Sequence, residues 1–219
     1  MTDLTTTSYL ILGMLSTRDW TAYDLAKQMD RGLGELWPRA ERQLYNAPKR
    51  LVAEGYVLAR KEPVGRRERT VYSITPDGRT ALEEWMGTTP RPSALEFEGM
   101  LRVVMADQGS IEELRDSLRA MVDQASTQRE LFVANAALML DGGSYPERQH
   151  VLTLANTFMI GHFTHIIEWA TWALDEIVDW PDTVTPATTE WDRSRAILQG
   201  VAALAVSTVP GAGPGPGHN

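Results

Sequence analysis

The chain of 219 residues contains no cysteine. Disulfide frameworks, thiolate zinc sites, iron–sulfur clusters and cysteine nucleophiles are therefore excluded, and the composition suits a reducing cytoplasm. No apolar run approaches the roughly 18 residues that a membrane span requires. Residues 1–7 also lack the basic and apolar segments of a signal peptide. The sequence thus predicts a cytoplasmic protein with no membrane contact.

Basic residues are scarce as well, with 21 Lys and Arg against 29 Asp and Glu, a net charge of −8. The deficit lies in the C-terminal part, because residues 1–87 hold 13 basic and 12 acidic residues and the remainder holds 8 and 17. Between Arg39 and Arg69 there are nine basic residues and four acidic ones. This local excess is typical of a protein that touches DNA with one part only.

The first 87 residues show the pattern of three helices, a hairpin and a fourth helix. Thr21 with Asp24 three residues later predicts a helix start, and Gly55 predicts a helix end. The turn at residues 63–66 separates two strand-like runs. The expected helices cover residues 5–17, 21–30, 38–54 and 75–86, and the strands cover residues 56–62 and 67–75. This order predicts a mainly α protein with a small β-hairpin, a winged helix-turn-helix.

Five short segments in this region also resemble the PadR family of bacterial transcriptional regulators. They are residues 9–15 (YLILGML), 22–25 (AYDL), 43–45 (QLY), 49–56 (KRLVAEGY) and 71–79 (VYSITPDGR). The resemblance implies a homodimeric, repressor-type DNA-binding protein. It further implies that helices in the C-terminal part form the dimer and that a small, often aromatic, effector lowers the affinity for DNA.

The third predicted helix has one apolar and one cationic face. At about 100° per residue, the apolar face contains Leu44, Ala47, Pro48, Leu51 and Val52. The opposite face contains Arg39, Arg42, Asn46 and Lys49. These residue types read bases and hold phosphates in a major groove, although a solvated helix face also explains them. Pro48 predicts a kink inside this helix, because it lacks the N–H that would bond the carbonyl of Leu44.

In the hairpin, Tyr72 and Ile74 occupy one face of a strand, and basic residues occupy the other face and the tip. A basic wing contacts phosphates or the minor groove, whereas charge that protects a ribbon edge is the structural alternative. The predicted DNA contacts are Arg39, Arg42, Tyr45, Asn46 and Lys49 of the helix, and Arg66, Arg67 and Arg69 of the wing.

The remaining chain predicts a helical domain. Capping boxes at Ser93, Ser110 and Ser144 open helices to about residues 108, 139 and 180, and Gly142 with Gly143 makes the last two an antiparallel hairpin. Residues 185–206 predict one more helix whose apolar side chains pack on this bundle. We expect a DNA-binding domain over residues 1–87, a dimerisation and effector domain over residues 88–209 and a disordered, Pro/Gly-rich tail over residues 210–219.

The helix expected over residues 146–180 has two apolar faces, so one should pack within the chain and the other across a homodimer interface. The second face carries the candidate effector contacts Phe158, His162, His165, Trp169 and Trp172. An aromatic stripe at this spacing is also typical of a packed core or interface. His162 and His165 are three residues apart, with no third ligand evident, so no metal and no cofactor are expected.

The sequence therefore predicts a DNA-binding regulator, a homodimeric repressor that binds a palindromic double-stranded operator and is released by a small aromatic or phenolic effector. An enzyme is the alternative of a different class, but no phosphate-binding loop, nucleophile elbow or metal-ligand cluster is evident. A ligand-binding or protein-interaction module that kept the winged-helix scaffold and lost DNA binding is the other alternative.

Overall fold

The computed structural model describes residues 4–29, 33–37, 46–65, 67–143 and 145–207, apart from the side chains of residues 64, 67 and 204–207. The chain divides into two compact units, residues 1–94 and 95–219. The predicted tail over residues 210–219 lies outside the described residues.

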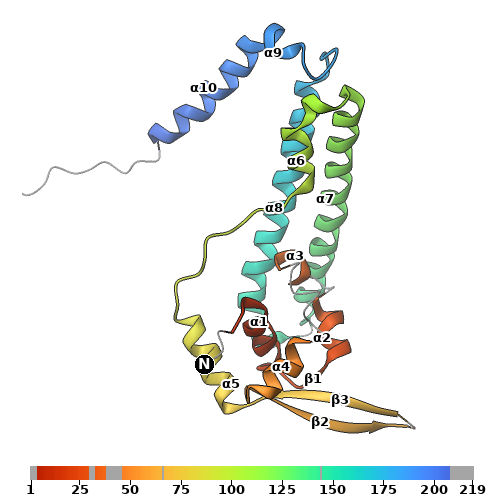
Figure 1. The fold of residues 1–219 in the computed structure, drawn as a ribbon, viewed down its shortest axis with the longest axis vertical. Coiled ribbons are helices and arrows are strands. Elements are labelled where there is room, and N and C mark those ends of the chain that lie inside the picture. Colours follow the sequence, from red (N-terminus) through yellow and green to blue (C-terminus); the bar gives the residue numbers. More distant parts are fainter. Residues whose placement is uncertain (1–3, 30–32, 38–45, 66, 144, 208–219) are drawn as a thin grey trace, which may run out of the picture. The chain divides into compact units, whose positions relative to one another are not determined.

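The first unit contains short helices and a small sheet. Its elements are α1 (Thr6–Leu15), β1 (Trp20–Thr21), α2 (Ala22–Gln28), α3 (Gly34–Leu36), α4 (Ala47–Ala53), β2 (Val57–Val64), β3 (Arg67–Ile74) and α5 (Pro76–Met86). Figure 1 shows β2 and β3 as a projecting ribbon. The strand order is β1-β3-β2, and both pairings are antiparallel. The predicted winged helix-turn-helix class is confirmed, and the structure adds β1 and the short helix α3 to the predicted order. Residues 38–45 of the third predicted helix lie outside the described residues.

Helix α1 lies at the centre of this unit. Its apolar run places Ile11, Leu12 and Leu15 in the core, each at most 1% exposed, together with Leu25 of α2 and Leu51 of α4. Thr5 caps α1 by accepting a hydrogen bond from the amide of Ser8, and Thr21 caps α2 in the same way through Asp24. Because neighbouring elements cover both faces of α1, its sequence is apolar on all sides. A helix on the surface would instead have one apolar and one polar face.

The second unit is built on a long helical hairpin. Its elements are α6 (Glu98–Val104), η3 (Ala106–Gln108), α7 (Ile111–Leu140), η4 (Pro146–Arg148), α8 (Gln149–Glu176), α9 (Pro186–Thr189) and α10 (Trp191–Ser207). Helices α7 and α8 lie side by side (Figure 1). Leu118 packs near Ala173 at one end of the pair, and Asn135 bonds Asn156 at 3.0 Å nearer the other, so the helices are antiparallel as predicted.

Two expected elements in this unit were placed wrongly. Ser93 opens no helix; residues 93–96 are exposed and α6 begins at Glu98, because Phe97 is extended and packs against the core of α7 and α8. Helix α8 ends at Glu176 and not near Trp180. Beyond this end, Arg115 donates hydrogen bonds to the carbonyls of residues 177, 178 and 180, which fixes a turn in place of further helix.

The last helix also differs from its prediction. Trp191, Leu198 and Val201 of α10 are about half exposed or more, so these side chains do not pack on the bundle. An ion pair joins α10 to α8 instead, with Arg193 Nε 2.6 Å from Glu176 Oε1 and Nη2 2.9 Å from Oε2. The hydrogen bond from Arg193 lowers the pKa of Glu176.

Candidate nucleic-acid interface

The first turn of α4 presents two of the predicted DNA-contacting residues to solvent. Ala47, Pro48 and Leu51 are buried, whereas Asn46 and Lys49 are exposed. The amide of Asn46 makes no capping hydrogen bond to the helix, although this residue precedes it directly. The beginning of a recognition helix is the part that meets base edges in a helix-turn-helix, so these side chains lie where readout would occur. Arg39, Arg42 and Tyr45 lie outside the described residues.

Pro48 does not interrupt the described helix. It lies in the first turn of α4, where the missing N–H leaves no hydrogen bond unmade and the fixed φ favours the helix. The kink predicted at Pro48 within a helix over residues 38–54 is therefore wrong for the part that the structure describes. The proline marks a helix start, and the carbonyl of Asn46 accepts the first hydrogen bond from Arg50 at 3.1 Å.

A buried hydroxyl fixes α4 against α1. Arg50 Nη2 donates a hydrogen bond of 2.6 Å to Oγ of Ser8, which is fully buried. The same hydroxyl is 3.0 Å from Thr5 Oγ1 in the capping box of α1. A helix of seven residues has little stability of its own, so this bond and the burial of Leu51 set its orientation. Nothing in the sequence signalled that Ser8 bonds a residue 42 positions away.

Replacing Ser8 with alanine is expected to destabilise the first unit by about 1 to 2 kcal/mol. The substitution removes a hydrogen bond to a charged group. The expected cost in stability lies toward the lower end of the usual range for such bonds, because Arg50 is partly exposed. Urea unfolding of the full chain measures this change. Ser16→Ala is the matched control, since among the described residues the Ser16 hydroxyl bonds the carbonyl of Gly13, three residues earlier in the chain. Equal stability losses in the two variants would contradict this role for Ser8.

The wing is a tight hairpin. Val64 pairs with Arg67, so the loop of the hairpin lies between these two residues, and Gly65 has φ +60°, which glycine adopts without strain. Arg66 and the side chain of Arg67 lie outside the described residues. Two steps from the loop, Arg69 pairs across the strands with Glu62.

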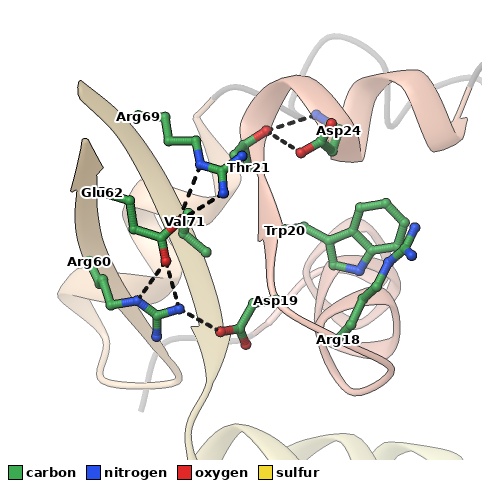
Figure 2. Close-up of a pocket in the computed structure, with 9 residues that line it drawn as sticks. All are labelled: Arg18, Asp19, Trp20, Thr21, Asp24, Arg60, Glu62, Arg69 and Val71. Atoms are coloured by element: carbon green, nitrogen blue, oxygen red, sulfur yellow. Dashed lines mark hydrogen bonds and ion pairs between the residues drawn. The ribbon is translucent and has the colours of Figure 1, made fainter. Parts of the chain in front are cut away.

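Glu62 joins two arginines of the wing (Figure 2). Its Oε2 accepts from Arg69 Nε at 3.2 Å and Nη2 at 2.9 Å, and its Oε1 accepts from Arg60 Nε at 3.1 Å and Nη2 at 3.0 Å. Arg60 Nη2 also lies 3.1 Å from Asp19 Oδ2. Hydrogen bonds from Arg69 and then Arg60 lower the pKa of Glu62, so the carboxylate is charged at neutral pH. The sequence pattern identified Arg69 but not the carboxylate that pairs with it.

A surface hollow of about 470 Å³ is bordered by four charged side chains, those of Asp19, Arg60, Glu62 and Arg69. Trp20 lies in its wall with the guanidinium of Arg18 stacked 3.9 Å from the ring centre (Figure 2). Two arginines and two carboxylates cancel in the Arg60–Glu62–Arg69–Asp19 group. The wing face that the structure describes is thus close to electrically neutral, which a count of basic residues along the sequence does not reveal.

The candidate effector residues are all at least partly exposed on α8, although Trp169 packs against the core between α7 and α8. Phe158 is 65% exposed and Trp172 is 43% exposed, His165 is exposed, and His162 and Trp169 are half-buried. On the other apolar face Met159, Phe163 and Ala170 are buried against α7, so this face is the one that packs within the chain. Phe158 and His162 stack at 6.4 Å between ring centres. In one chain the exposed members of this set, Phe158, His165 and Trp172, form an open stripe.

Metal sites and membrane spans require other arrangements of residues. Within the described ranges, no three His, Cys, Asp or Glu side chains are placed to hold a metal ion. Among the helices that the structure describes, none is long and apolar enough to cross a membrane.

The helices α1, α2 and α4, the β2–β3 ribbon and α5 together form a winged helix-turn-helix unit. Residues 11–84 match the family model described as "Transcriptional regulator PadR-like family". These residues therefore form a domain of the PadR-like family of transcriptional regulators. This is a family of regulators and not of enzymes, so the enzymatic alternative is set aside.

Similarity to known proteins covers more of the chain than the family model does. The negative transcriptional regulator PadR of Bacillus subtilis is 29% identical over 110 residues, which are 49% of this chain and 60% of that protein. The chain thus spans about 60% of the length of this curated relative. The crystal structure of B. subtilis PadR with operator DNA has a TM-score of 0.67 at 23% identity, covering 79% of this chain and 99% of that one. The same protein with p-coumaric acid gives 0.59 at 22% identity, covering 78% and 98%. Both likenesses support the fold.

Proposed function

We propose that this protein regulates transcription by binding double-stranded DNA through α4 and the wing. The observation that carries the proposal is the first turn of α4, where Asn46 and Lys49 are exposed on a helix held in place by Arg50 and Ser8. An amide pairs with adenine and an ammonium group with guanine or phosphate in a major groove. That B. subtilis PadR is described as a negative regulator and has been solved with operator DNA supports a repressor role.

We propose further that the protein acts as a homodimer through the outer face of α8. Leu154 is 73% exposed and Phe158 is 65% exposed on this face, and residues 149–167 contain no Lys, Arg, Asp or Glu. An uncharged apolar stripe of this length on a helix is typical of an interface between subunits. A two-fold dimer would present two copies of α4 to a palindromic site.

The pairing of Arg69 and Arg60 with carboxylates favours one other function, that of a winged-helix module without DNA binding. A gel shift with the full chain distinguishes the two. The probe is the DNA upstream of the protein's own coding region, and a random-sequence duplex of equal length is the control. A salt-sensitive shift of the upstream DNA at lower protein concentration supports a regulator. If neither duplex shifts at 50 mM salt, the result favours the alternative, a winged-helix module that does not bind DNA.

A small aromatic effector would act by preferring one dimer geometry over another. The exposed rings of α8 and the p-coumaric acid complex of B. subtilis PadR support a phenolic compound. We expect phenolic acids to quench tryptophan fluorescence, and operator DNA to weaken their binding about 5- to 150-fold through reciprocal linkage. The quenching should be lost in Trp172→Phe and kept in Trp191→Phe, which alters α10. Equal ligand affinity with and without DNA would show that the compound is no inducer.

A further inference from the structure

Arg60 and Arg69 differ in the number of carboxylates that they contact. Arg60 contacts two carboxylates, Glu62 and Asp19, so it keeps a partner if Glu62 is neutralised. Arg69 bonds Glu62 through two nitrogens, and it has no other ion pair or hydrogen bond among the described side chains. The availability of the Arg69 guanidinium to a ligand therefore depends on Glu62.

Arg69 lies near the end of the wing. The pairs Val64–Arg67 and Pro63–Glu68 separate it from the hairpin loop. Two residues of strand span about 7 Å, which an arginine side chain can bridge. A duplex that contacts the loop is therefore within reach of this guanidinium. The side chain is 54% exposed, so no repacking is needed for it to reach outward.

A carboxylate and a phosphate present the same kind of acceptor to an arginine. Both offer two oxygens to the planar guanidinium fork, so they compete for one set of donors. The lowered pKa of Glu62 keeps the competing carboxylate charged at neutral pH.

We propose that Glu62 restrains DNA binding by the wing, because it holds the Arg69 guanidinium that would otherwise contact a phosphate. This inference rests on the proposed function, since it concerns how the same surface meets DNA. Phosphate contacts dominate binding to DNA of any sequence. Glu62 therefore weakens attachment to unrelated DNA and leaves recognition to the base contacts of α4.

Two glutamine variants of the full chain test the proposal on a random-sequence duplex. Glu62→Gln removes the charge that holds Arg69. Glu68→Gln is the matched control, because it removes one charge of an exposed pair with Lys61, 3.0 Å long, on the same hairpin. We expect Glu62→Gln to bind more tightly than Glu68→Gln. One added phosphate contact steepens the salt slope by about 0.9, so the difference should shrink roughly threefold between 50 and 200 mM salt.

A second substitution identifies the arginine responsible. Adding Arg69→Ala to Glu62→Gln should remove the gain and restore the salt slope. Equal affinities and slopes for Glu62→Gln and Glu68→Gln, or a gain that survives Arg69→Ala, would overturn the proposal. The unsubstituted chain is titrated in parallel with the upstream DNA. If it binds that DNA while the two glutamine variants are equal, the proposed function stands and this inference fails. If no variant binds either duplex, the proposed function fails as well.

Discussion

Replacing Asn46 and Lys49 together with alanine should weaken binding to the operator by at least about 30-fold while leaving the fold intact. A direct base or charge-assisted phosphate contact is worth about 1 to 3 kcal/mol, and the two side chains lie one helical turn apart. The fold should persist because Asn46 makes no capping bond and Lys49 is exposed. Fluorescence anisotropy with labelled operator measures the affinity, and thermal unfolding measures the fold.

The single variants separate the two kinds of contact. A phosphate contact by Lys49 predicts that Lys49→Ala weakens all sequences alike and lowers the salt slope by about 0.9. A base contact by Asn46 predicts that Asn46→Ala relaxes discrimination at one position of the operator. Arg119→Ala is the matched control, because this exposed arginine on α7 also carries one positive charge. An operator affinity of the double variant equal to that of Arg119→Ala would reject α4 as the reading surface.

Phe158→Glu is expected to convert the dimer to monomers and to weaken operator binding about 10²- to 10⁴-fold. The substitution places a charge in the centre of the uncharged stripe on α8, where desolvation would be costly. A monomer binds one half-site and loses the gain from simultaneous contact at two. Light scattering measures the mass, and anisotropy measures the affinity.

Thr157→Glu is the control for this experiment, because Thr157 is also exposed on α8 and lies outside the apolar stripe. It should remain dimeric and bind the operator with nearly normal affinity. Dissociation of both variants to the same extent would mean that added charge and not the stripe is responsible. An unsubstituted chain that is monomeric at micromolar concentration would reject the dimer outright.

Local signals predicted most of the fold. The capping residues Thr21, Thr75 and Ser110 mark helix starts as the structure has them, because each accepts a hydrogen bond from the amide three residues later. Such bonds depend on neighbouring residues only, so a sequence displays them. Strand β1 has two residues and exists through its pairing with β3, so no periodic pattern could reveal it.

The pairing of charged side chains in the wing depends on strand register, and the register predicted from the sequence was wrong by two residues. A turn over residues 63–66 would place Glu62 opposite Arg67, whereas the observed pairing of Val64 with Arg67 places it opposite Arg69. Since register determines every cross-strand neighbour, this small error concealed the Arg60–Glu62–Arg69 group. The bond between Arg50 and Ser8 joins residues far apart in the chain, and nothing local encodes it.

We propose that two copies of this chain place two α4 helices on one DNA site. A hydroxyl-radical footprint of the full-length protein on the DNA upstream of its coding region tests it most directly. We predict two protected half-sites whose centres lie about 10 to 10.5 base pairs, or a multiple of this distance, apart. Saturating protein that leaves this DNA unprotected, or that protects one isolated half-site, would contradict the account.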